Sequence, residues 1–174
     1  MKNLIYWFLI YICSSLLMGC GPEDTPSDQE LINNFQSNRE AYEKVLKVFL
    51  SEPNLDNVEI NDYGTGLKLR SNLENVKFNK QDMFNDLQKL NVELVKVVSR
   101  RPVDESASEI QFISFRTGIV SAGRSKGVAY FRYGLPNNID NDLDKYDPPI
   151  NKIFPNDNEN AYLKIEGRWY LFSD

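Results

Sequence analysis

The spacing of apolar residues changes at Pro53, and this change constrains the fold more than any other feature of the chain. Before Pro53 the apolar residues recur at intervals of three, four or seven: Leu31, Phe35, Tyr42, Val45, Leu46 and Phe49. Such a stripe is typical of an amphipathic helix. Ser27 and Glu30 precede it with the spacing of a capping box. The pattern predicts one continuous helix of about 23 residues that starts after Ser27 and ends before Pro53.

After Pro53 the chain reads mainly as short strands separated by turn residues. A second, shorter helix is expected from Asn79, a good N-cap residue, to about residue 90. The predicted strands cover residues 58–60, 67–70, 92–98, 109–120, 126–133, 161–165 and 168–172. The order predicts an α+β fold, in which one long N-terminal helix and a shorter second helix pack on an antiparallel sheet of about five to seven strands.

Composition removes most catalytic classes. The 174 residues include no histidine, and the two cysteines are Cys13 and Cys20. Ser-His-Asp and Cys-His catalysis and every histidine-containing metal site are therefore excluded. A pair of carboxylates of the glycosidase type needs no histidine, but no spacing in the chain indicates one. We expect a protein that is not an enzyme and has no cofactor, and the net charge of −5 argues against nucleic acid as a partner.

The N-terminus has the three parts of an export signal: Lys2, an apolar run over residues 4–12, and small residues before Cys20. Leu-Met-Gly-Cys at residues 17–20 resembles the lipobox of bacterial lipoproteins. The resemblance implies that residues 1–19 are removed and that Cys20 is acylated, which would anchor the protein to a bilayer. Gly21, where inner-membrane lipoproteins have Asp, resembles the outer-membrane case and implies a periplasm-facing protein. The inner membrane and the cell surface are alternatives for its location, and an ordinary cleaved signal or an anchor helix are alternatives for the segment.

The predicted mature chain has a tether at residues 20–27 and a single α+β domain at residues 28–174. Within the domain, residues 135–160 form an excursion rich in Asn, Asp and Pro. Asp140, Asp142 and Asp144 alternate as in the first half of a calcium loop, but Lys145 and Asn151 stand where the loop needs Gly and Glu. A solvated acidic loop and a weak calcium site are the two interpretations.

Residues 110–139 contain no carboxylate but several basic residues, and aromatic residues gather on the C-terminal strands. Our candidate binding residues are Arg116, Arg124, Lys126, Arg132, Tyr130 and Trp169. The basic residues predict a site for an anion or an acidic partner, unless the acidic excursion folds back on them. The leading hypothesis is a non-catalytic periplasmic interaction module, such as an inhibitor, an immunity-type protein or an envelope-assembly protein. It would bind the bilayer through Cys20 and an envelope protein through its domain. The alternative is a carrier of a small apolar ligand in an aromatic-lined pocket.

Overall fold

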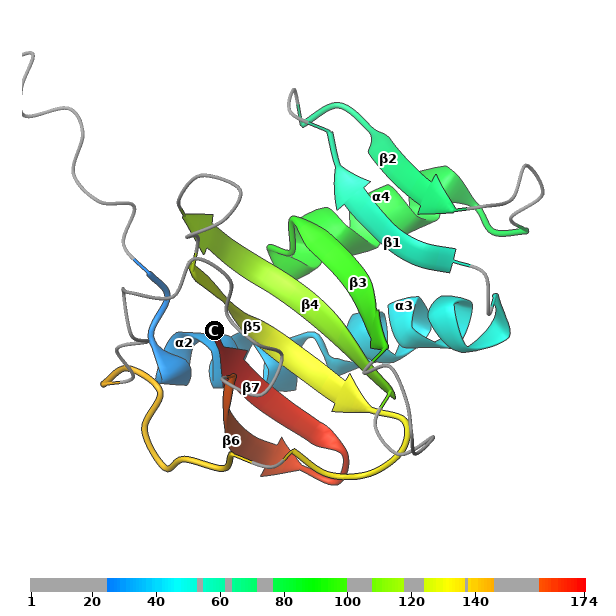
Figure 1. Ribbon diagram of the computed structural model, residues 1–174. Helices are drawn as coiled ribbons and strands as arrows, with labels where there is room; N and C mark the ends of the chain where they lie inside the picture. The colour runs from blue at the N-terminus through cyan, green and yellow to red at the C-terminus, as the bar shows by residue number, and fades with distance from the viewer. Residues whose placement is uncertain are drawn as a thin grey trace, which may run out of the picture.

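A seven-stranded antiparallel sheet forms the centre of the fold in this computed structural model, with the three described helices on one of its faces (Figure 1). The strands follow the spatial order β2-β1-β3-β4-β5-β7-β6. Their bounds are Leu55–Ile60 (β1), Leu67–Ser71 (β2), Leu94–Ser99 (β3), Ser108–Thr117 (β4), Arg124–Phe131 (β5), Ala161–Glu166 (β6) and Trp169–Ser173 (β7). The structure describes residues 25–52, 55–61, 64–71, 77–99, 108–117, 124–136, 138–145 and 160–174. The predicted α+β class and antiparallel sheet are confirmed.

The prediction of one long N-terminal helix is wrong, because the helix breaks at Asn38. The chain forms two short helices there, α2 (Asp28–Ser37) and α3 (Arg39–Ser51). The Asn38 side chain donates hydrogen bonds to the backbone oxygen of Asn34 (3.2 Å) and to its Oδ1 (2.7 Å). Asn side chains that bond to nearby backbone groups compete with the regular helix, and apolar spacing alone does not reveal this. The break leaves α2 in contact with β5 and β7, while α3 contacts α4 (Lys80–Leu90).

Both predicted helix starts are confirmed in detail. At α2 the Ser27 hydroxyl accepts from the Glu30 N–H at 3.3 Å, and the Glu30 carboxylate accepts from the Ser27 N–H at 2.8 Å. At α4 the Asn79 side chain accepts from two backbone N–H groups of the first turn. None of the described helices is long and apolar enough to span a membrane.

The hydrophobic core lies between the helices and the sheet. Strand residues that face the helices include Val58, Val95, Phe112, Val128 and Leu171, and they pack with helix residues such as Phe35, Tyr42, Phe49 and Leu87. A second buried cluster consists of alternate residues of β4 to β7: Ile113, Ala129, Phe131, Tyr162, Tyr170 and Phe172. Because successive side chains of a strand point to opposite faces, the two clusters occupy the two faces of the sheet.

Gly127 allows β4 and β5 to approach closely at an irregularity in their pairing. The register shifts between Ile113 and Phe115, and Gly127 pairs with Ile113. A Cβ atom at residue 127 would lie 2.0 Å from the backbone oxygen of Phe112. This position therefore needs glycine for steric reasons, as is common at β-bulges. Lys126, the residue next to it, enters the candidate site.

Candidate binding site

Lys126 is a buried cation that joins three parts of the chain. It lies on β5, its side chain is 4% exposed, and its Nζ is 2.6 Å from Oδ1 of Asp144 and 2.9 Å from Oδ1 of Asp28. The contact with Asp144 is a hydrogen bond, and the contact with Asp28 is an ion pair without hydrogen-bond alignment. Burial of an ammonium group is costly unless carboxylates neutralise it, and here two of them do.

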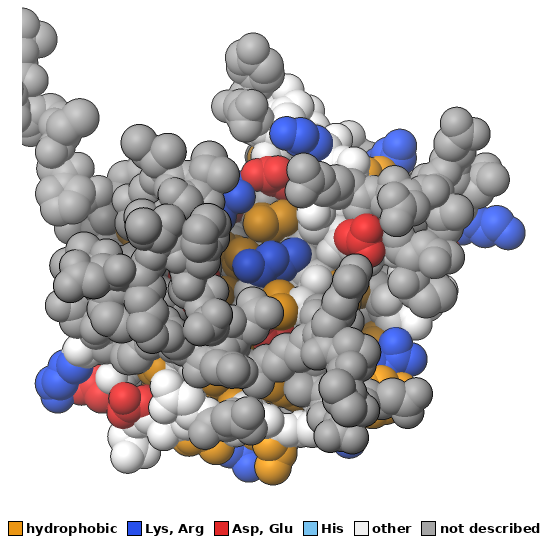
Figure 2. Space-filling view, viewed as in Figure 1, with side chains coloured by type: hydrophobic (Ala, Val, Ile, Leu, Met, Phe, Trp, Pro, Cys, Tyr) orange, Lys and Arg blue, Asp and Glu red, His pale blue; other side chains and the backbone are white. Residues whose placement is uncertain are grey.

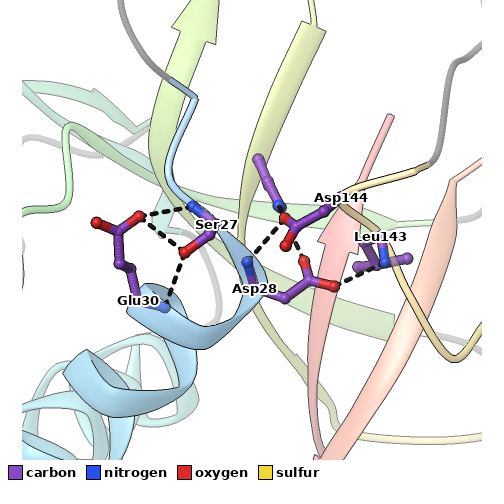
Figure 3. Close-up of polar contacts among 6 residues, drawn as sticks. Ser27, Asp28, Glu30, Leu143 and Asp144 are labelled. Atoms are coloured by element: carbon purple, nitrogen blue, oxygen red, sulfur yellow. Dashed lines mark hydrogen bonds and ion pairs between the residues drawn. The ribbon is translucent and has the colours of Figure 1, made fainter.

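The capping of α2 positions Asp28 for this contact. Asp28 is the first residue of α2, where the partial positive charge of the helix N-terminus favours a carboxylate. Its Oδ2 accepts from the Leu143 N–H at 2.7 Å, and its own N–H donates to Asp144 Oδ1 at 2.8 Å. Figure 3 shows the Asp28 and Asp144 carboxylates turned toward each other beside the capped helix start. Residues 143 and 144 belong to the predicted excursion, so hydrogen bonds and an ion pair hold this part of the excursion against α2 and β5.

The charge of Asp144 is stabilised within the cluster. Burial by itself raises the pKa of the Asp144 carboxyl, but the hydrogen bonds from Lys126 and from the Asp28 N–H outweigh it and leave the pKa below its usual value. Asp142, two residues earlier, pairs with Lys145 at 2.5 Å, and this contact lowers the Asp142 pKa. Asp144 therefore stays ionised at neutral pH and balances the Lys126 charge.

A cavity of about 280 Å³ adjoins the cluster. Its wall includes four hydroxyl-bearing residues, one aromatic ring and the Lys126 side chain: Thr25, Ser27, Ser125, Ser173, Phe115 and Lys126. Asp144 also contributes to the wall. The Ser125 hydroxyl donates to Asp174 Oδ2 at 2.7 Å, which adds a further carboxylate close to this region. The cavity wall therefore combines many hydrogen-bonding groups with apolar surface, to which Phe115 and Leu143 contribute.

The weak calcium site, one of the two interpretations of Asp140, Asp142 and Asp144, is not assembled from these three residues. Among the described residues, the carboxylates whose oxygens come within 4.8 Å of one another are those of Asp28, Asp142 and Asp144. Asp140 instead accepts from the Asn141 N–H at 2.6 Å. The ammonium group of Lys126 already contacts two carboxylates of this trio, so it supplies positive charge where a metal ion would otherwise be needed.

The other candidate basic residues lie apart. Arg116 is exposed on β4 and pairs with Glu59 at 2.7 Å and with Glu93 at 3.4 Å. Partial burial lowers the Arg116 pKa, but these two carboxylates outweigh it and raise the pKa above its usual value. Arg132 is exposed beyond β5, over the Tyr133 ring. Figure 2 likewise shows the visible basic side chains at separate places on the sheet side of the molecule. The side chain of Arg124 and Cys20, the predicted acylation site, lie outside what the structure describes.

The candidate aromatic residues pack with each other. Trp169 is buried, and its ring lies 5.0 Å from the Tyr130 ring, 5.0 Å from the Phe35 ring and 5.7 Å from the Phe112 ring. These edge-on and tilted contacts are typical of core aromatic clusters. Tyr130 is half-buried at the border of this cluster. The two residues thus contribute to packing between α2 and the sheet, and the described cavity beside Lys126 has Phe115 in its wall instead.

Sequence reasoning did not single out Asp28, Ser125 or Asp174 as parts of the site. The capping box located the start of α2 but did not indicate that its first residue turns toward a strand lysine about 100 residues away. Asp174 accepts from the Ser125 N–H at 2.5 Å, a contact that depends on the pairing of β5 with β7. An isolated Lys next to Gly127 in a strand was the available signal for the buried cation.

An α+β fold with helices on one face of an antiparallel sheet is the class that these observations define. Comparisons with protein-family models, with curated proteins and with solved structures found no match to the chain.

Proposed function

We propose that this protein is a lipid-anchored, non-catalytic interaction module that binds an acidic envelope protein through one exposed edge of its sheet. The edge consists of Tyr133, Leu135 and Ile139 with the cations Arg132, Lys164 and Arg168, and we call it the β6 edge patch. Anchoring and partner binding are separate parts of the proposal and have separate tests.

The exposed hydrophobic side chains of the patch carry the proposal. Tyr133, Leu135 and Ile139 are 51%, 63% and 56% exposed, and all three lie between β5 and β6. Ile139 forms a parallel bridge with Tyr162 of β6, which holds this stretch against the edge of the sheet. Large hydrophobic residues held at an ordered surface are a common feature of protein-binding sites.

The charge of the patch indicates the kind of partner. The Arg132 guanidinium lies 5.2 Å from the centre of the Tyr133 ring, and Lys164 and Arg168 are exposed on or beside the neighbouring hairpin. Among the described residues of this edge, the acids are Asp140 and Glu166, and Glu166 pairs with Arg39, so the three cations outnumber them in a chain whose net charge is −5. Along the lower edge of Figure 2, hydrophobic and basic side chains lie side by side. Such a surface fits a partner that presents apolar side chains surrounded by carboxylates.

The lipobox supports anchoring close to the bilayer. Thr25, the first described residue, follows Cys20 by five positions, and five extended residues span at most about 17 Å. An acylated Cys20 would therefore keep the start of α2 near the membrane. The β6 edge patch lies on another side of the fold from this start (Figure 1), so it would stay accessible to a protein.

Anchoring is tested by Cys20→Ala in a bacterial host supplied with radiolabelled palmitate. The expected result is loss of the label from the protein, an uncleaved N-terminus and release of the protein from the lipoprotein fraction. Normal labelling of the variant would contradict the proposed attachment site. Cys13→Ala is the matched control, because Cys13 lies in the segment that the proposal has removed, and the control should be labelled normally.

Partner binding is tested with a photo-crosslinking amino acid at Leu135 in the intact envelope. We expect one dominant adduct to a protein that is acidic at its contact surface. The adduct should decrease at least about tenfold in Arg132→Glu/Lys164→Glu, since both substitutions reverse charges that face the partner. Lys68→Glu, at the opposite edge strand β2, is the control and should leave the adduct unchanged. Equal adduct formation in all three proteins would refute the proposed surface.

A further inference from the structure

The cavity beside Lys126 contains hydrogen-bonding capacity that the described residues do not use. The Nζ group has three N–H donors; Asp144 accepts from one of them, while the Asp28 carboxylate contacts the charge without accepting a hydrogen bond. The remaining donor capacity has no hydrogen-bond partner among the described residues, and Lys126 lines the cavity. Oδ1 of Asp144 accepts from Lys126 and from the Asp28 N–H, whereas Oδ2 has no partner in the described part of the chain. A donor and an acceptor thus stand close together at the cavity wall.

We propose that this cavity binds a neutral polyhydroxylated molecule the size of a monosaccharide. Two neighbouring hydroxyls of such a ligand would match this donor and acceptor: one accepts from Lys126 Nζ and the other donates to Asp144 Oδ2. The Thr25 and Ser173 hydroxyls offer further bonds, and the Phe115 ring offers an apolar surface for the C–H face of a sugar ring. This inference depends on neither the lipid anchor nor the β6 edge patch.

The charges around the cavity disfavour the other small-ligand classes. Asp28 and Asp144 place two carboxylates against one ammonium group, so an anion would meet net repulsion. A ligand ammonium that reached Asp144 Oδ2 would lie close to the buried Lys126 cation. An apolar ligand would leave both the free N–H and Oδ2 desolvated without partners. A hydroxyl both donates and accepts, and a polyol adds no charge, so it satisfies both groups.

The size of the cavity sets the expected affinity. Its volume of about 280 Å³ lies near the lower end of the range for small-molecule sites. A hexose has about 12 non-hydrogen atoms, and at ordinary ligand efficiency it would bind with a dissociation constant on the order of 1–10 mM. Weak, saturable binding is therefore the expected result.

The test is saturation-transfer difference NMR on the full chain in micelles of lauryldimethylamine oxide, a detergent without sugar groups. The probes are D-glucose, D-galactose, D-mannose and N-acetyl-D-glucosamine, with methyl phosphate and n-butylammonium as the anionic and cationic comparisons. At least one aldohexose should give a saturable signal in the millimolar range, and the two charged probes should give none. Absence of a saturable sugar signal, or a saturable signal from a charged probe alone, would overturn the proposal.

Variants locate the binding. Asp144→Asn removes the free carboxylate oxygen with little change of size and should weaken sugar binding about tenfold. Asp142→Asn is the matched control, because Asp142 pairs with Lys145 and does not line the cavity, and it should bind like the unchanged chain. Ser173→Leu fills the cavity and should abolish the signal while circular dichroism stays unchanged. Equal binding by Asp144→Asn and Asp142→Asn, or full binding by a folded Ser173→Leu protein, would place the sugar elsewhere and refute the assignment.

Discussion

Replacement of Lys126 by Met tests the buried ion-pair cluster most directly. The substitution keeps the length of the side chain and removes the charge that two carboxylates share. Loss of one partner of a buried ion pair costs about 3–5 kcal/mol of unfolding free energy, because the remaining charge is left unpaired. The side chain of Asp144 is 46% exposed and can regain water, whereas that of Asp28 is 12% exposed and cannot. We therefore expect a loss near the lower limit, about 3 kcal/mol.

Urea titration of the purified chain, followed by circular dichroism, measures this loss. With a slope of about 1.5–2 kcal/mol per molar urea for a chain of this size, the unfolding midpoint should fall by about 1.5–2 M. Adding Asp28→Asn to Lys126→Met should restore part of the stability, because the substitution removes the buried unpaired carboxylate.

Lys68→Met is the control for this experiment. Lys68 is exposed on β2, so its replacement should change the unfolding free energy by less than about 0.5 kcal/mol. If the unfolding free energy of Lys126→Met lies within about 1 kcal/mol of that of the unchanged chain, the reasoning from burial and pairing is refuted. The same holds if Asp28→Asn lowers the stability of the Lys126→Met protein further.

Three further predictions concern pH, a close backbone contact and a core hydroxyl. Because the folded pKa of Asp144 lies below its usual value, its contribution is present above about pH 4 and is lost as pH falls through the folded pKa. Urea titrations at pH 5 and pH 3 should thus show a larger loss of stability for the unchanged chain than for Asp144→Asn. Gly127→Ala places a Cβ atom against a backbone oxygen and should lower the unfolding free energy by about 3 kcal/mol. Gly66→Ala has only a flexible side chain 3.5 Å away and should lower it by less than about 1 kcal/mol. Equal losses in the two variants would contradict the steric explanation. Tyr42 buries a hydroxyl that has no hydrogen-bond partner in the described structure, so Tyr42→Phe should raise the unfolding free energy by up to about 1 kcal/mol, and a clear loss would indicate a partner for it.

Local patterns predicted the elements of the fold well. Alternation and turn residues located the strands, and the Ser27–Glu30 capping box located the start of the first helix to the residue. The same patterns missed the break at Asn38, because the apolar stripe continues through it and only side-chain hydrogen bonds interrupt the helix. The spacing of apolar residues indicates which face of a helix is buried, but it does not reveal a single residue that bends the backbone.

The candidate site was harder to predict, because its parts come from distant segments. Asp28, Lys126 and Asp144 look like ordinary surface charges in the sequence, and the basic residues around Lys126 suggested an exposed surface. The fold turns Lys126 toward α2 and leaves Arg116 exposed with its own partners. The sequence shows how many charged residues a segment has, but which of them form ion pairs depends on which segments meet in the fold.

The amino-acid sequence by itself determined the class of fold, the capped helix starts, the absence of histidine chemistry and the resemblance of residues 17–20 to a lipobox, because each depends on neighbouring residues. The tertiary structure alone decided that Lys126 is buried, that Asp28 and Asp144 neutralise it, and that Gly127 must lack a side chain. The ion pairs arise where α2, β5 and the segment before β6 pack together, and the Gly127 constraint arises where β5 pairs with β4. Burial, and with it the energetic weight of a charge, is a property of that packing and not of local sequence.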